Sequence, residues 1–284
     1  MNLWKVGLFL LGGIGAAGTL RAAVPASSVP SFLPGARSVL WVGAHPDDEV
    51  LAAPLLARWC LDEKLRCTFL IFTSGERGKC LLPGGCPPNL ATVRRAEMKN
   101  VARSYGARLV HWTLPDGGAL PDGSAPAWDA ARGGHRGLIA AIGREIDAAA
   151  ADVVLTLDPF HGSTCHPDHR AVGSLVSEAV HSTATNATLF FLETRWEVKT
   201  SPLSISFRPA APLAAGTFAF DANLPRGPQR QPAWNALIDD ASRHPSQFDP
   251  EWLNALARVP AARRAIYLAP ADLIVSSPAV LTCR

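Results

Sequence analysis

Two short clusters of histidines and carboxylates stand out in the chain, because each combines side chains that bind metals with side chains that move protons. The first is His45–Glu49, with the sequence HPDDE, and the second is His166–His169, with the sequence HPDH. Imidazoles and carboxylates are costly to bury unless a cation, hydrogen-bond donors or water satisfies them. The two clusters therefore predict a site that holds a cation.

The residue types in these clusters match what metal-assisted hydrolysis requires. A catalytic zinc site takes three nitrogen or oxygen ligands from the protein and keeps a fourth position for water. His45 and Asp48 can reach one ion from a single turn, and a histidine of the second cluster completes the set. One aspartate then remains to accept a proton from the water, and a second histidine remains to stabilise charge on a carbonyl oxygen.

Each cluster follows a segment that is typical of a buried strand. Residues 38–43 form an apolar run that stops at a glycine shortly before a proline, which predicts a strand that ends at a sharp turn. Residues 152–157 form a similar run before the loop that carries the second cluster. Because ligands of open α/β sheets bind outside the carboxyl ends of the strands, we expect both clusters to share one crevice.

The wider pattern alternates strands with helices, which predicts a mostly parallel sheet with right-handed crossovers. We therefore expect an α/β, Rossmann-like fold with helices on both faces of the sheet, plus a C-terminal α/β extension packed on it. Residues 121–134, rich in Gly, Ala and Pro, are expected to form a loop with at most a short helix. Further strands are expected at 68–73, 108–114, 188–196 and 204–208, and helices at 50–61, 92–105, 137–150, 170–180, 234–242 and 252–264.

The first residues have the layout of a secretory signal peptide. Lys5 precedes an apolar run over 6–20, and small residues follow, so we expect cleavage after Ala22 or Ala26. The domain boundaries expected are 1–26 for the signal, 27–200 for the main domain and 201–284 for the extension. This predicts an exported protein, periplasmic or secreted, with no stable membrane span after cleavage. An uncleaved anchor is the alternative, although a span needs about 20 apolar residues.

The six cysteines form an even set, as expected of a protein in an oxidising compartment. Cys80 and Cys86 bracket a short, turn-rich loop and are expected to form a disulfide. Cys165 precedes the second cluster, where its thiolate could compete as a zinc ligand, but we favour a disulfide or a buried thiol. The remaining cysteines are Cys60, Cys67 and Cys283. The sequence alone does not decide which of the six cysteines pair with one another.

The charge of the chain does not indicate binding to nucleic acid. The formal net charge is +3, and charged residues make up only 18% of the sequence. A nucleic-acid surface usually needs a strongly basic patch or stripe. We therefore expect a small-molecule partner, while the oligomeric state stays unknown.

Four motifs, taken in order and spacing, resemble the LmbE and PIG-L family of zinc-dependent de-N-acetylases. The resemblance covers about residues 38–180, and the segment 234–248, which contains the sequence HPSQ, resembles the closing helix of the family. The resemblance implies an LmbE-like version of the fold described above. The four motifs are His45–Glu49, Thr73–Gly78 with the sequence TSGERG, Arg94–Glu97 with the sequence RRAE, and His166–His169.

The resemblance also implies roles for the residues that match the family motifs. By resemblance, Asp47 is the general base and His166 stabilises the oxyanion, while the zinc ligands are His45, Asp48 and His169. Another divalent ion, iron among them, can replace zinc in a site of two histidines and one aspartate. A simpler alternative, in which Asp47 and its neighbours only cap a helix, leaves His45 and the second cluster unexplained.

Three further residues are assigned supporting roles by the same resemblance. Asp168 is expected behind His166, where a carboxylate would fix the tautomer of the ring. Arg94 and Asp116 align with family positions that hold sugar hydroxyls. Glu49 is expected to anchor the turn or its helix rather than to take part in the chemistry.

The reaction implied by the resemblance is hydrolysis of the N-acetyl group of an N-acetylglucosamine-type conjugate, which releases acetate and a free amine. Two alternatives remain open. One is a zinc hydrolase that acts on another acyl amide or an ester, and the other is a catalytically silent carbohydrate-binding relative. The presence of Asp47 argues against the silent relative, because binding alone needs no general base.

Overall fold

The computed structural model describes residues 35–118, 123–183, 185–193, 196–200, 203–207 and 216–271. The expected signal peptide at 1–26 and Cys283 lie outside the described residues. Within the part of the chain that the structure describes, no helix is both long enough and apolar enough to cross a membrane.

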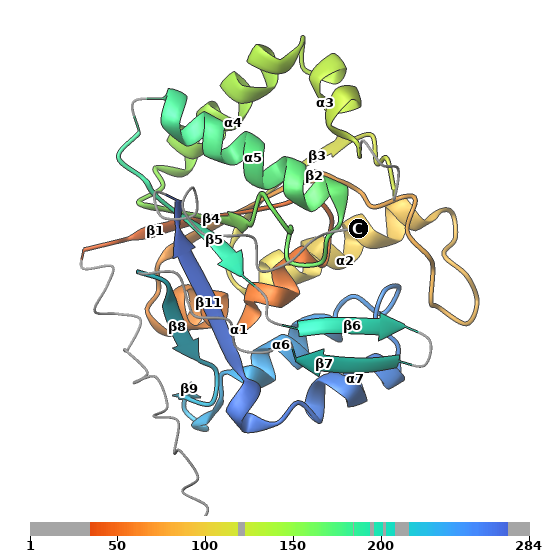
Figure 1. Ribbon diagram of the computed structural model, residues 1–284. Helices are drawn as coiled ribbons and strands as arrows, with labels where there is room; N and C mark the ends of the chain where they lie inside the picture. Colours follow the sequence, from red (N-terminus) through yellow and green to blue (C-terminus); the bar gives the residue numbers. More distant parts are fainter. Residues whose placement is uncertain are drawn as a thin grey trace, which may run out of the picture.

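Seven strands form one sheet in the order β3-β2-β1-β4-β5-β11-β8 (Figure 1). The first five strands along the chain pair in parallel, whereas β11 lies antiparallel to both β5 and β8. The strand order reverses between β1 and β4, which is the position where open α/β sheets bind ligands. The bounds are β1 Ser38–Gly43, β2 Arg66–Thr73, β3 Arg108–Leu114, β4 Val153–Leu157, β5 Thr188–Glu193, β8 Phe218–Asp221 and β11 Ala265–Pro270.

Helices cover both faces of the sheet, as expected (Figure 1). Along β1, Val39 and Trp41 pack into the core on one face, and Leu40 and Val42 pack into the core on the other. This two-sided burial explains why the strand reads as a continuous apolar run. One layer contains α3 Ala125–Ala131, α4 His135–Ala149 and α5 Pro167–Ser182, and the other contains α1 Ala53–Leu56, α2 Leu90–Ser104, α6 Trp234–Ala241 and α7 Pro250–Ala257.

The segment after β1 is less regular than the single helix expected over 50–61. It consists of a 3₁₀ turn over Asp48–Ala52, the short α1, and a π-helical turn over Ala57–Asp62. Pro54 lies at the start of α1 and lacks the N–H that a continuous helix would need there. The expected loop at 121–134, in contrast, contains the short helix α3, as the sequence allowed.

The C-terminal part of the chain differs most from expectation. The strand expected over 188–196 ends at Glu193, and the helix expected over 252–264 ends at Ala257, before Pro260. Strands β8 and β11 were not expected; they lengthen the main sheet beyond β5, while α6 and α7 of the same segment pack on its face. The remaining short elements are β6 Trp196–Thr200, paired with β7 Leu203–Phe207, β9 Pro225–Arg226, paired with β10 Gln231–Pro232, and the 3₁₀ turn Ala261–Arg263.

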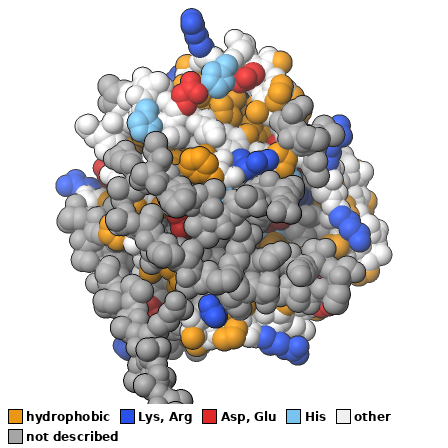
Figure 2. Space-filling view, viewed as in Figure 1, with side chains coloured by type: hydrophobic (Ala, Val, Ile, Leu, Met, Phe, Trp, Pro, Cys, Tyr) orange, Lys and Arg blue, Asp and Glu red, His pale blue; other side chains and the backbone are white. Residues whose placement is uncertain are grey.

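The surface agrees with the low net charge of the chain. On the described part of the face in Figure 2, Lys and Arg side chains lie apart from one another and form no basic patch. This face therefore gives no support for a nucleic-acid surface.

Two disulfides join residues close in sequence. Cys80 pairs with Cys86, as expected, and Cys60 pairs with Cys67, which links the end of the first crossover to β2. Cys165 is also disulfide-bonded, so it offers no free thiolate to a metal.

We expect peptide mapping without reductant to recover the Cys60–Cys67 and Cys80–Cys86 pairs. Each bridge closes a short loop, with sequence separations of 7 and 6. Chain entropy predicts that replacing both cysteines of one pair by alanine lowers the free energy of unfolding by about 2–3 kcal/mol. Chemical denaturation of the two double variants measures this loss. Free thiols in the unreduced wild-type digest would contradict the pairing.

Candidate active site

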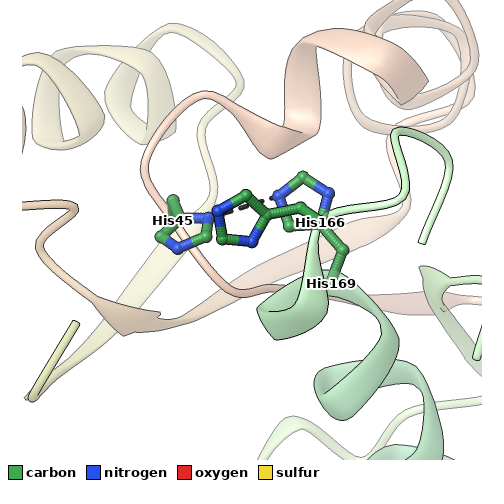
Figure 3. A group of neighbouring side chains, drawn as sticks. All are labelled: His45, His166 and His169. Carbon is green, nitrogen blue, oxygen red and sulfur yellow. Dashed lines mark hydrogen bonds between the residues drawn. The ribbon is translucent and has the colours of Figure 1, made fainter. Parts of the chain in front are cut away.

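The two polar clusters meet at the carboxyl ends of β1 and β4, on either side of the point where the strand order reverses. His45 lies two residues beyond β1, and His166 is the N-cap of α5. Figure 3 shows the rings of His45, His166 and His169 converging on one another from these separate elements. The single crevice expected from the sequence is therefore present.

The three predicted zinc ligands form a compact triangle of donor atoms. His45 Nδ1 lies 3.2 Å from His169 Nε2, and His169 Nε2 lies 2.9 Å from Asp48 Oδ1. The third side, from His45 Nδ1 to Asp48 Oδ1, is 3.8 Å. Ligands bound tetrahedrally to zinc at about 2.0–2.1 Å are about 3.3 Å apart. The arrangement of these buried side chains therefore fits a zinc-sized ion.

Asp48 and His169 are held in orientations that suit metal binding. The second oxygen of Asp48 accepts the backbone N–H groups of Ala44 and His45, at 2.7 and 2.9 Å. His169 Nδ1 lies 2.9 Å from the carbonyl oxygen of Gly162, so this nitrogen carries the proton and Nε2 is left with its lone pair. A histidine ligand commonly donates its other ring N–H in this way.

His166 lies next to this triangle. Its ring centroid is 4.9 Å from that of His45 and 4.9 Å from that of His169, and the three rings offer nitrogens that lie within 4.8 Å of one another. His166 Nδ1 accepts the backbone N–H of Asp168 at 3.2 Å, which leaves Nε2 to carry the ring proton. His166 can therefore donate a hydrogen bond into the cavity.

The position expected for Asp168, behind His166, is wrong. Its carboxylate lies behind His45 instead, with Oδ2 3.3 Å from His45 Nε2, and it accepts hydrogen bonds from the backbone N–H and hydroxyl of Ser124 at 2.5 and 2.7 Å. The cause is the start of α5, where the N-cap His166 and the buried Asp168 in the first turn point in different directions. Asp168 therefore directs His45 Nδ1, and not Nε2, toward the metal position.

This contact predicts that Asp168→Asn weakens metal binding about 10- to 100-fold, because the amide no longer fixes the His45 tautomer as a carboxylate does. Competition against a chelator measures the affinity. Asp152→Asn is the matched control, since Asp152 bonds Arg37 and Ser38 at the opposite end of β1. Equal affinities in the two variants would contradict the assignment.

Asp47, the predicted general base, lines the cavity beside the triangle. Its Oδ1 is 2.6 Å from Arg94 Nη2, and Arg94 also donates to the carbonyl oxygens of Pro46 and Gly75. Gly75 has φ +62 and its missing side chain leaves the space that the guanidinium fills, which explains the first glycine of the TSGERG motif. Burial raises the pKa of Asp47, and Arg94 offsets part of this rise.

The two predicted sugar-binding residues both line the cavity, but most of their polar atoms, Arg94 Nε excepted, already have partners in the protein. The buried Arg94 holds Asp47, as described above. Asp116 accepts the backbone N–H groups of Arg77 and Gly118 at 2.9 and 2.7 Å, and its Oδ1 lies 3.8 Å from His45 Nε2. Contacts of either residue with sugar hydroxyls stay a prediction.

The charges in the site favour a cation near His45. Burial lowers the pKa of His45, but the carboxylates of Asp168 and Asp48 outweigh burial and raise it to about 10. Burial lowers the pKa of His166 to about 4, and the neighbouring rings of His169 and His45 add to this effect, so His166 is neutral near pH 7. The excess of carboxylates around His45 is balanced by the charge that a divalent ion would supply.

A cavity of about 420 Å³ opens over these residues and has two different sides. One side is polar and is made by the two clusters together with Arg77, Arg94 and Asp116. The other is apolar and comes from the first turn after β1 and from the C-terminal helices. Its residues are Val50, Leu51, Leu237, Phe248, Trp252 and Leu256.

Sequence reasoning missed the contact between Glu49 and His244. Both side chains are fully buried, and Glu49 Oε1 lies 2.5 Å from His244 Nε2 across 195 residues of sequence. The one related feature of the sequence was the HPSQ segment, which contains His244. The sequence links this segment only to the closing helix of the family, and not to Glu49. Ser124, the partner of Asp168, was also missed, because it lies in a stretch that read as loop.

The pKa of His244 predicts a pH-dependent stability. Burial lowers this pKa, but Glu49, with smaller contributions from Asp47 and Asp240, raises it to about 9 from its ordinary value of 6.5. Glu97 also faces the ring, at 3.9 Å. Since the folded pKa is raised, the stability from this ionisation is fully present below pH 6.5 and is lost as the pH rises through about 9.

The melting temperature of wild type should therefore exceed that of His244→Asn by a margin that shrinks between pH 6.5 and pH 9. Thermal scans of both proteins across this range measure the margin. A margin that grew with pH would contradict the assignment.

Comparison with known proteins agrees with the motifs. Residues 40–180 match the PIG-L family, described as GlcNAc-PI de-N-acetylase. The chain belongs to the PIG-L family. This family match contains every predicted site residue, from His45 to His169.

Two curated relatives of this PIG-L protein are deacetylases of 1D-myo-inositol 2-acetamido-2-deoxy-alpha-D-glucopyranoside. The enzyme of Rhodococcus opacus is 31% identical over 166 residues, which cover 52% of this chain and 55% of the relative. The enzyme of Gordonia bronchialis is 30% identical over 168 residues, which cover 52% and 58%. The chain thus spans little more than half the length of these relatives.

Solved structures show the same fold at low sequence identity. N,N'-diacetylchitobiose deacetylase from Pyrococcus horikoshii aligns with a TM-score of 0.56 and 18% identity, covering 87% of this chain and 88% of its own. Teicoplanin deacetylase Orf2 aligns with a TM-score of 0.52 and 17% identity, and the alignment covers 82% of this chain and 98% of that protein. GalB, a 4-carboxy-2-hydroxymuconate hydratase from Pseudomonas putida, aligns with a TM-score of 0.54 and 14% identity. The alignment covers 87% of this chain and 98% of GalB. Because a hydratase shares the fold, the fold alone does not determine the reaction.

Proposed function

We propose that this PIG-L protein is a metal-dependent deacetylase that hydrolyses the N-acetyl group of an N-acetylglucosamine-type conjugate, releasing acetate and a free amine. The observation that carries the proposal is the triangle of His45 Nδ1, Asp48 Oδ1 and His169 Nε2 with Asp47 beside it. The names of the curated relatives support an acetamido sugar as the substrate class.

The proposed metal ion is zinc, or another divalent ion in its place, held by His45, Asp48 and His169. When bound, zinc lowers the pKa of water toward about 7 and polarises the amide carbonyl. Asp47 accepts a proton from the attacking water, while Arg94 keeps its carboxylate in place. The neutral His166 donates its Nε2 proton in a hydrogen bond to the amide oxygen as negative charge develops there. Asp47, which has taken the proton of the water, then donates it to the leaving nitrogen.

The test is an acetate assay on the purified mature protein, combined with metal analysis. The panel contains N-acetylglucosamine, its inositol conjugate and N,N'-diacetylchitobiose. We expect bound divalent metal and acetate release from at least one conjugate, with loss of release after chelation and recovery when zinc is returned. Conjugate binding without turnover by the metal-loaded protein would favour the silent carbohydrate-binding relative instead.

The apolar side of the cavity favours a second candidate substrate, an amide with a longer acyl chain. Leu51, Phe248 and Trp252 on that side can bury a hydrocarbon chain but offer few polar groups to a sugar. A series of glucosamine amides from acetyl to decanoyl separates the two. A value of kcat/KM that rises with chain length would favour the longer acyl amide, and one that is highest for acetyl would favour the deacetylase.

We further propose that the protein is exported. The N-terminal pattern supports this, as do the two disulfides, because disulfides persist mainly in oxidising compartments. N-terminal sequencing of protein recovered from the periplasm or medium tests the proposal. A chain that keeps Met1 and remains in the cytoplasm would overturn it.

A further inference from the structure

The backbone of Asp47 adopts a conformation that needs outside support. Its φ is 108° and its ψ is −10°, in a region that residues with a side chain rarely occupy. Such a conformation persists only where surrounding contacts hold it, and it is common at functional sites. The backbone N–H of Asp47 donates to Glu49 Oε2 at 3.1 Å. Glu49 therefore holds the backbone of the residue that the proposed mechanism uses as its base.

Glu49 is in turn held by His244. The second carboxylate oxygen of Glu49 lies 2.5 Å from His244 Nε2, and neither side chain has any exposed surface. A fully buried carboxylate is costly unless it is paired, and the cost is high when one partner is removed. Without the His244 donor, Glu49 would have to move toward other donors or water, and its contact with Asp47 would move with it.

His244 lies in a turn that follows α6 and is itself fixed to α2. Ser246, two residues later, donates its backbone N–H and its hydroxyl to Glu97 at 2.9 and 2.6 Å. This turn lies outside residues 40–180, the part that matches the PIG-L family. A segment beyond the matched part thus reaches back to the loop that follows β1.

We propose that Glu49 and His244 form a positioning pair that fixes the backbone of Asp47 and, through it, the direction of the Asp47 carboxylate. Neither residue lines the cavity, so both act through Asp47 and not on the substrate. The effect on turnover rests on the role proposed above for Asp47, whereas the effect on its backbone does not. Arg94 fixes the other end of the same residue by holding its carboxylate.

The test uses two matched substitutions of the full-length mature protein. His244→Gln keeps a donor at the place of Nε2, whereas the shorter His244→Asn does not reach Glu49. Ser246→Ala is the structural control, because it loosens the same turn at Glu97 without touching Glu49. Glu49→Asp, whose shorter side chain cannot reach both partners, is a second way to break the pair if His244→Asn does not fold.

The first readout is hydrogen exchange of the peptide that contains the Asp47 amide, and it needs no substrate. We expect exchange at this amide to be about tenfold faster in His244→Asn or Glu49→Asp, and near wild type in His244→Gln and Ser246→Ala. Unchanged exchange in the first two variants, or equally fast exchange in Ser246→Ala, would overturn the proposal.

The second readout is kinetic and uses whichever conjugate the wild type hydrolyses. In His244→Asn we expect kcat to fall about 10- to 100-fold with KM and metal content unchanged, and His244→Gln to recover most of it. A fall in kcat that follows the melting temperature equally in all variants would indicate a purely structural pair and overturn the proposal. If the wild type hydrolyses no conjugate, the proposed function fails while the exchange measurement still decides the positioning.

Discussion

Replacing Asp47 by asparagine is expected to lower kcat about 100- to 10,000-fold, the range typical of a lost general base. The amide cannot accept the proton of the attacking water. Metal binding should survive, because Asp47 faces Arg94, at 2.6 Å, and is not part of the triangle of ligand atoms. Acetate release, measured beside the metal content of the same sample, checks both parts of the prediction.

Asp62→Asn is the control for this substitution, since Asp62 pairs with Arg226 at 3.3 Å and does not line the cavity. It removes the same charge from the protein and should leave kcat unchanged. An Asp47→Asn protein that turned over at the wild-type rate would show that another group takes the proton.

Substituting His169 by alanine is expected to remove the metal and the activity together. Its Nε2 is the atom of the triangle closest to both others, at 3.2 Å from His45 Nδ1 and 2.9 Å from Asp48 Oδ1. Loss of a directly bound ligand should weaken metal binding by more than about 100-fold, the upper end of the effect expected for a residue that only supports a ligand. Metal analysis after dialysis, followed by the acetate assay, measures the loss.

His161→Ala provides a matched control, because His161 lies in the loop that leads into α5, close in sequence to His169, but pairs with Asp158, at 3.0 Å. This variant should keep its metal. Full metal occupancy in His169→Ala would contradict the ligand assignment, and loss of metal from His161→Ala would point to a general effect of the loop.

The parts of the site that could be predicted are those set by short stretches of sequence. The turn after β1 brings His45 and Asp48 together within four residues, and the start of α5 presents His166 and His169 at the end of a neighbouring strand. Parallel strands bring such ends to one edge, so the location followed from local patterns alone.

The position of Asp168 could not be read in the same way. Its place two residues after His166 suggested that the two side chains act together, but the helix N-terminus turns them toward different partners. Glu49 and His244, at 195 residues apart, have no local pattern that joins them. Contacts of this kind depend on tertiary packing, which residue spacing does not report.

The C-terminal strands were missed for a related reason. β8 has only 4 residues, and prolines divide the sequence around both strands, so neither was expected as a strand. They form because β11 finds partners on both sides in β5 and β8, through pairing that only the folded sheet provides.

The pairing of β11 with β5 bears on how the chain can be divided. Without β11, the outer edge of β5 would present unpaired backbone groups flanked by buried residues such as Phe190 and Leu192. Natural proteins shield such edges, because an exposed edge strand can pair with a strand of another molecule and cause aggregation. A fragment cut to the residues that match the family would also end before β5 and would lack His244. We therefore expect the smallest fragment that folds on its own to extend at least through β11.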